Sequence, residues 1–165
     1  MADKVKILLV EDNPGDARLA VIALQMADFD CIVDHVLDGV EALEHLHAAA
    51  DNAAENRIDL VLLDINLPKM NGREALARIK GSSTLSATPV IMLSTSSAED
   101  DLNFCYKHGA DAFLSKAQDF DAFVETIRGL KNFWIGVVQG DRRATIRPEQ
   151  TEIDGFEDRR AAATD

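Results

Sequence analysis

Acidic side chains close two apolar segments that lie far apart in the chain. Asp64 ends the run that begins at Leu60, and Glu11 and Asp12 follow the run Val5 to Val10. In a parallel sheet, the loops at the carboxyl ends of neighbouring strands meet in one crevice, where ligands bind. Three carboxylates in one crevice repel one another and resist ionising together unless a cation lies between them. The sequence therefore predicts a divalent-metal site around one reactive aspartate.

Three further groups near the ends of apolar segments suit the same chemistry. Ser94 offers a hydroxyl and Lys116 an ammonium ion to the oxygens of a phosphoryl group. The backbone carbonyl of Asn66, two residues past Asp64, is placed to give Mg²⁺ a further oxygen ligand. A carboxylate accepts a phosphoryl group when a metal screens the repulsion between the two. Asp64, at the end of a central strand, is the predicted nucleophile.

Apolar segments of strand length alternate with longer segments of helical period, which predicts βα units and a parallel sheet. The expected strands are Val5–Val10, Cys31–Val36, Leu60–Asp64, Pro89–Ser94 and Ala112–Ser115. The expected helices are 14–27, 39–50, 72–81, one opened by Ser97 and ending near His108, and 119–138. Asp34 and His35 interrupt the second strand and mark it as an edge strand, whereas the first, third and fourth are nearly all apolar, as central strands are. The predicted fold class is α/β.

Length, charge and composition argue against a nucleic-acid-binding, membrane-spanning or secreted protein. A length of 165 residues predicts one domain, and a net charge of −12 argues against nucleic acid as a direct partner. The chain contains no apolar run long enough to span a membrane, and its first residues lack the pattern of a signal peptide. Cys31 and Cys105 have neither metal-ligand nor redox-motif spacing, which indicates reduced core residues. We expect a cytoplasmic protein.

The last predicted helix carries more apolar residues than one buried face needs. Its stripe toward the sheet comprises Phe120, Phe123, Ile127, Leu130, Trp134 and Val137, and Phe133, Ile135 and Val138 lie outside that stripe. We expect a homodimer through this helix at Phe133, Trp134 and Val138; the alternative is that the tail or the first helix covers the patch. From Gly140 onward the periodicity ends. We therefore expect one domain over 1–139 and a charged tail or dimer arm over 140–165, with no output domain.

The four motifs together resemble the receiver domain of two-component response regulators over about residues 4 to 138. They are Val10-Glu11-Asp12-Asn13, Leu63-Asp64-Ile65-Asn66-Leu67-Pro68, Leu93-Ser94-Thr95 and Leu114-Ser115-Lys116. The resemblance implies a flavodoxin-like, doubly wound (βα)5 fold with strand order 2-1-3-4-5. It also implies that a histidine kinase or a histidine phosphotransfer protein phosphorylates Asp64.

The resemblance assigns a role to each residue of the predicted site. Asp12, Asp64 and the Asn66 carbonyl would hold Mg²⁺, with Glu11 assisting through the water shell of the metal. Ser94 and Lys116 would bind the phosphoryl group. Ser94 would move on phosphorylation, and Phe113 would turn inward as an aromatic switch. The alternative is that Phe113 is a fixed core aromatic.

One residue departs from the family pattern. The family usually has proline after the strand-five lysine, joined to it by a cis bond, and this chain has Ala117. A cis bond before a residue other than proline costs about 3 kcal/mol. Whether the Lys116–Ala117 bond is cis, and therefore how far Lys116 reaches, stays open.

The chain also shows a narrower resemblance within this family, and several other functions are alternatives to it. Phe133-Trp134, the long second helix and the expected lack of an output domain resemble features of single-domain regulators paired with bacterial phytochromes. A phosphatase of the haloacid-dehalogenase type needs an acidic residue two positions after its nucleophile, and this chain has Asn66 there. We therefore expect a phosphoacceptor with slow autodephosphorylation and not a turnover enzyme. A nucleotide-binding module would want a glycine-rich phosphate loop, which the chain lacks. A phosphate sink and an unphosphorylated binding module stay as alternatives.

Overall fold

Five parallel strands form the sheet that positions the predicted site. The computed structural model describes residues 4–52, 56–95, 98–116, 119–138 and 156–158. The strands are β1 (Val5–Val10), β2 (Cys31–Val36), β3 (Leu60–Asp64), β4 (Val90–Ser94) and β5 (Ala112–Ser115). They lie in the order β2-β1-β3-β4-β5, so the predicted fold class and strand order are confirmed. β2 lies at the edge, as its polar residues predicted.

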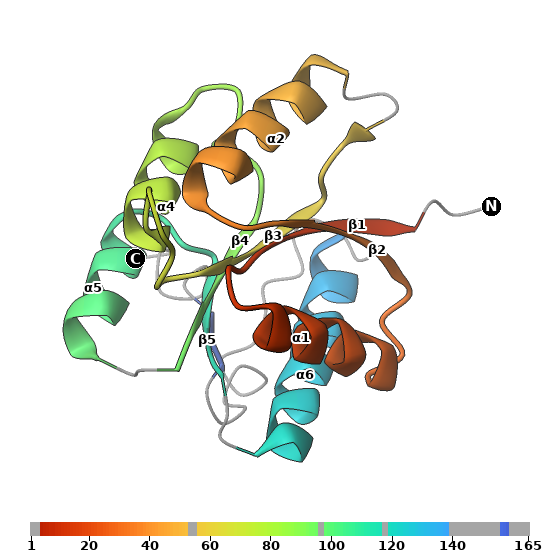
Figure 1. Ribbon diagram of the computed structural model, residues 1–165. Helices are drawn as coiled ribbons and strands as arrows, with labels where there is room; N and C mark the ends of the chain where they lie inside the picture. Colours follow the sequence, from red (N-terminus) through yellow and green to blue (C-terminus); the bar gives the residue numbers. More distant parts are fainter. Residues whose placement is uncertain (1–3, 53–55, 96–97, 117–118, 139–155, 159–165) are drawn as a thin grey trace.

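Five helices cover the two faces of the sheet. They are α1 (Pro14–Met26), α2 (Gly39–Asp51), α4 (Gly72–Gly81), α5 (Glu99–Lys107) and α6 (Phe120–Val138). α1 and α6 lie on one face, and α2, α4 and α5 lie on the other (Figure 1). Among the described residues, none of the helices combines the length and apolar character needed to cross a bilayer.

Side chains at the crevice edge of the sheet start three of these helices. Asn13, Asp38 and Asn71 each accept a hydrogen bond from the backbone N–H three residues ahead, which satisfies a free donor of the first turn. α5 instead follows Ala98, which has no capping side chain. The expected capping residue, Ser97, lies outside the described residues.

Each face of the sheet has its own buried cluster. Ile7 and Leu9 of β1 pack with α1 and α6, whereas Leu8 and Val10 pack with α2, α4 and α5. Successive side chains of a strand point to opposite faces, so a central strand covered on both sides is apolar throughout. The apolar runs that predicted β1, β3 and β4 therefore follow from burial on two faces.

A sixth strand joins the sheet from the region that we expected to be a tail. β6 (Phe156–Asp158) pairs antiparallel with β5, and Phe113 lies opposite Glu157. Three residues are too few for a periodic pattern, which explains why the sequence did not predict the strand. The remaining residues after Val138 lie outside the described part of the chain, so the division at residue 139 stays a prediction.

Two aromatic side chains at the end of α6 are covered within the chain itself. Phe133 and Trp134 are only 5% and 6% exposed, and both belong to the cluster that includes Ala20 and Ala23 of α1. The burial of Trp134 agrees with its expected place in the stripe that faces the sheet, and Phe133, which was expected outside that stripe, is buried as well. Burial within the chain agrees with the alternative in which other parts of the same chain cover them. The side chain of Val138 lies outside the described residues.

Lys80 joins three segments at the end of the sheet opposite to the crevice. Its ammonium group donates to the carbonyls of Ser86 and Thr88 at 3.2 and 2.8 Å and to Asp111 Oδ2 at 3.0 Å. The same Asp111 oxygen accepts the Val90 N–H at 2.8 Å. The side chains of Lys80 and Asp111 are 15% and 9% exposed, so each charge depends on the other.

We predict that Lys80→Met lowers the free energy of unfolding by about 2–3 kcal/mol, because it leaves the buried Asp111 carboxylate without its cation. Urea unfolding measures the change. Lys107→Met is the matched control, since Lys107 is an exposed lysine of α5. Equal unfolding midpoints for the two variants would contradict the structural role of Lys80.

Candidate functional site: a carboxylate cluster at the end of the sheet

The sheet brings the three predicted carboxylates together. β1 and β3 are hydrogen-bonded neighbours with Val10 opposite Leu63, so the residues that follow them meet at one edge. Oxygen atoms of Glu11, Asp12 and Asp64 all lie within 4.8 Å of one another. Glu11 and Asp64 are buried and Asp12 is exposed.

Asp64 resists ionisation in this cluster. Burial raises the pKa of its carboxyl group to about 7; Lys116 opposes the rise, and Glu11 adds to it. The site fits a hard divalent cation, because its donors are all carboxylate oxygens and the exposed Asp12 leaves it open to solvent. Such a cation would offset the repulsion among the carboxylates. The residues present therefore fit a metal of the Mg²⁺ class.

Lys116 completes the site from the end of β5. Its ammonium group donates a hydrogen bond to Glu11 and lies 3.4 Å from Asp64 Oδ2 and 3.5 Å from Asp16 Oδ2. Burial alone would lower the pKa of Lys116, but the three carboxylates overcome that effect and raise it, so the group stays charged. Ala117 lies outside the described residues, so the isomer of the Lys116–Ala117 bond stays an open prediction.

The loop after β3 is closed at its base by Gly72. The Gly72 N–H donates to the Ile65 carbonyl at 2.8 Å, and a Cβ on Gly72 would lie 2.1 Å from the Asp64 carbonyl oxygen. Only a residue without a side chain fits so close to the backbone of Asp64. Asn66, whose carbonyl the sequence assigned to the metal, is exposed in this loop.

The tip of the same loop is attached to the start of α2. The Gly39 N–H donates to the Met70 carbonyl at 3.2 Å, and Lys69 Nζ lies 3.6 Å from the buried Asp38 carboxylate. Lys69 has a φ of 61°, a left-handed conformation that a residue with a side chain adopts only at a cost. Sequence reasoning treated Asp38-Gly39 only as a helix start and missed this contact, because no local pattern links it to Lys69.

Ser94 and Phe113 are both buried side chains of the neighbouring strands. Ser94 ends β4 opposite Ser115 and is fully buried, and its carbonyl accepts the Lys116 N–H at 2.6 Å. Phe113 is 3% exposed in the cluster on the α5 face. Phe113 points into the core in this structure, and its role as an aromatic switch stays a prediction.

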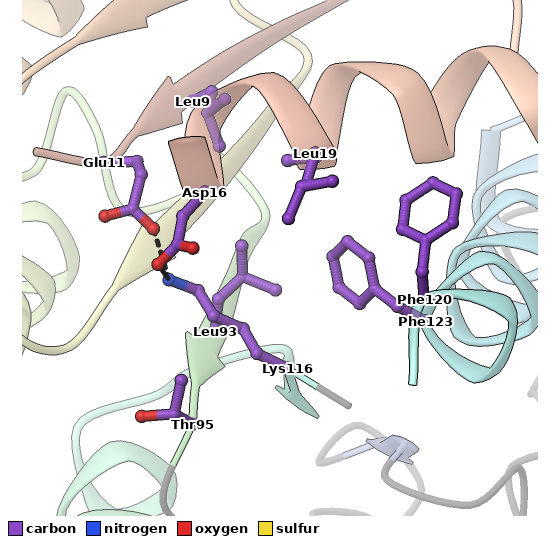
Figure 2. A pocket seen from close by; sticks show the side chains of 10 residues that line it. Leu9, Glu11, Asp16, Leu19, Leu93, Thr95, Lys116, Phe120 and Phe123 are labelled. Carbon is purple, nitrogen blue, oxygen red and sulfur yellow. Dashed lines mark hydrogen bonds and ion pairs between the residues drawn. The ribbon is translucent and has the colours of Figure 1, made fainter. Parts of the chain in front are cut away.

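A cavity of about 290 Å³ adjoins the carboxylate cluster, between α1 and the start of α6. Figure 2 shows Glu11, Asp16 and Lys116 converging at one side of it, with Leu19 and Phe120 farther along. Sequence reasoning did not single out Asp16. Its position in the first turn of a helix that begins at the crevice was the available signal.

We predict that Asp64→Asn stabilises the metal-free protein, and more so at pH 8 than at pH 5. The unfolded-state pKa of Asp64 is about 4 and the folded-state value is higher, so the native state binds more protons between the two. Stability contributed by Asp64 therefore falls as pH rises through that window. The gain at pH 8 should be on the order of 2 kcal/mol.

Urea unfolding with and without Mg²⁺ measures this gain. Saturating Mg²⁺ should stabilise wild type more than Asp64→Asn, because the variant has lost a metal ligand. Destabilisation of the metal-free protein by Asp64→Asn at pH 8 would contradict the proposed electrostatics of the cluster.

The chain resembles known proteins over most of its length. Residues 7–128 match the family model of the response regulator receiver domain. The chain is 36% identical to response regulator Rcp1 of Synechocystis sp. over 132 residues, which are 80% of this chain and 90% of Rcp1. It is also 36% identical to the probable methanogenesis regulatory protein FilR2 of Methanothrix harundinacea over 134 residues, with 81% and 86% covered.

Solved structures show the same relationship. The phosphorylated cyanobacterial phytochrome response regulator RcpA is 39% identical and superimposes with a TM-score of 0.73 over 82% of this chain and 97% of RcpA. The Mn²⁺-bound form of Rcp1 is 35% identical, with a TM-score of 0.71 over 81% and 96%. The motifs, the fold and these matches agree: the chain belongs to the response regulator receiver domain family.

Proposed function

We propose that the protein carries a signal by accepting a phosphoryl group on Asp64 from a histidine kinase. The observation that carries this proposal is the surroundings of Asp64. The same carboxylate lies within a cluster of three acids and 3.4 Å from the Lys116 ammonium group. An acceptor that has to attack an anionic phosphoryl group needs both kinds of charge compensation.

Mg²⁺ is the metal that this donor set favours in our proposal. Glu11, Asp12, Asp64 and the carbonyl of Asn66 would hold it, directly or through water. When bound, the ion supplies charge screening between the acceptor and the phosphoryl group. The Mn²⁺-bound form of Rcp1 shows that a related protein holds a divalent cation.

The phosphoryl transfer involves the side chains of Asp64, Lys116 and Ser94. A carboxylate oxygen of Asp64 forms a bond to phosphorus as the bond from phosphorus to the donor breaks, and the electron pair of that bond leaves with the donor. Lys116 neutralises the transferred group, and the Ser94 hydroxyl would donate to one of its oxygens. Asn66 offers no acid or base for hydrolysis. We therefore propose a slowly hydrolysing phosphoacceptor and no turnover enzyme.

The partner is proposed from the relatives. RcpA is a phytochrome response regulator by name, so a phytochrome-type histidine kinase is our preferred phosphodonor, with a histidine phosphotransfer protein as the alternative. FilR2 is as similar in sequence as Rcp1 and is named for another process. A phosphate sink, in which Asp64 drains a kinase without further output, stays as the second candidate function. We place either reaction in the cytoplasm.

Self-association through α6 is part of the proposal and requires a rearrangement. Phe133 and Trp134 are buried within the chain, so they would have to be uncovered before they meet a second copy. Light scattering on the phosphorylated and unphosphorylated protein tests this, and a monomer in both states would remove the dimer from the proposal.

We predict that acetyl phosphate with Mg²⁺ adds one phosphoryl group to the wild-type chain, measured by intact mass. Asp64→Asn should gain none, and wild type without divalent metal should gain little, because repulsion in the cluster is then unscreened. Asp59→Asn, one residue before the opposite end of β3, is the matched control and should be phosphorylated like wild type. A folded wild-type protein that gains no mass would favour the unphosphorylated binding module.

A further inference from the structure

The ammonium group of Lys116 has three carboxylate partners that differ in one respect. Glu11 and Asp64 belong to the cluster that fits a metal ion, whereas Asp16 does not. A cation held by the cluster would draw Glu11 and Asp64 toward itself and weaken their hold on Lys116. Asp16 is then the remaining partner of Lys116 among these three.

Asp16 is well suited to keep a negative charge in one place. It lies in the first turn of α1, where its N–H donates to Asn13 Oδ1 at 3.0 Å. The N-terminus of a helix favours a negative side chain. Its side chain is 44% exposed, so its attraction for Lys116 is moderate and reversible.

The neighbouring cavity leaves space for the Lys116 side chain to change position. It lies between α1 and α6, and its walls include Leu19, Leu93 and Phe120 (Figure 2). An aliphatic lysine stem can lie along apolar walls while its charged end changes partner. The Lys116 ammonium group already lies 3.4 Å from Asp64 Oδ2 and 3.5 Å from Asp16 Oδ2, so a change of partner between these two sides needs no repacking of the core.

We infer that Asp16 is a positioning residue that holds Lys116 on the cavity side of the site and competes with the phosphoryl group for it. This inference rests on the proposed function of Asp64. Asp16 does not contact the reacting atoms in this account. It sets how readily Lys116 is released to the incoming group, and thus how strongly a phosphoryl-like anion binds.

Removal of the Asp16 charge should therefore strengthen binding of a phosphoryl-like anion. An exposed ion pair contributes a modest free energy, which corresponds to a change of about two- to fivefold in a binding constant. The probe is beryllofluoride, which stands in for a phosphoryl group on a carboxylate oxygen. Calorimetric titration with saturating Mg²⁺ gives its dissociation constant.

The matched control is Asp100→Asn, which changes the net charge equally and also lies in the first turn of a helix. We expect Asp16→Asn to lower the beryllofluoride dissociation constant about two- to fivefold, while Asp100→Asn leaves it unchanged. Asp16→Glu, which keeps the charge, should remain close to wild type. In a Lys116→Met background, Asp16→Asn should give no gain.

Three results would overturn the inference. Unchanged or weaker binding in Asp16→Asn, an equal gain in Asp100→Asn, or a gain that persists without Lys116 would each show that Asp16 does not act by retaining Lys116. A wild-type protein that binds no beryllofluoride with Mg²⁺ would refute the proposed function as well. The wild-type titration thus separates failure of this inference from failure of the function.

Discussion

Repulsion among three carboxylates at one edge of the sheet is the constraint on which the site depends. The parallel pairing of β1 and β3 delivers Glu11, Asp12 and Asp64 to the same place, and two of them are buried there. Water cannot fully solvate these groups, so a proton on Asp64, the Lys116 ammonium or a bound cation has to compensate for their charge. Exchange among these three forms of compensation gives the site its chemistry.

The surrounding fold keeps this unfavourable arrangement in place. Strands that are buried on both faces leave the residues at their ends little freedom, and the loop after β3 is fixed at its base by Gly72 and at its tip by Gly39. The left-handed backbone of Lys69 lies between two contacts with the start of α2, the ion pair of Lys69 with Asp38 and the hydrogen bond from the Gly39 N–H to the Met70 carbonyl. The free energy of folding gained in the rest of the protein offsets the repulsion and the backbone strain at the site.

The sequence predicted the elements whose signals are local and periodic. Apolar runs located the five strands, and polar residues at the ends of those runs located Asp64 and Lys116. β6 was missed because three residues carry no period, and the burial of Phe133 was missed because helical periodicity does not show what covers a second face. Contacts such as Asp16 with Lys116 join residues 100 positions apart, so only the folded chain reveals them.

The most direct test of the account is the pKa of Asp64, followed by carbon NMR of labelled aspartate and assigned with Asp64→Asn. We predict a titration midpoint near 7 in the metal-free protein, because burial and Glu11 disfavour the charged form. Mg²⁺ should move that midpoint to lower pH, since a cation in the cluster stabilises the carboxylate. A midpoint near the ordinary value of about 4, unchanged by Mg²⁺, would show that the carboxylate cluster neither suppresses the ionisation of Asp64 nor binds the cation.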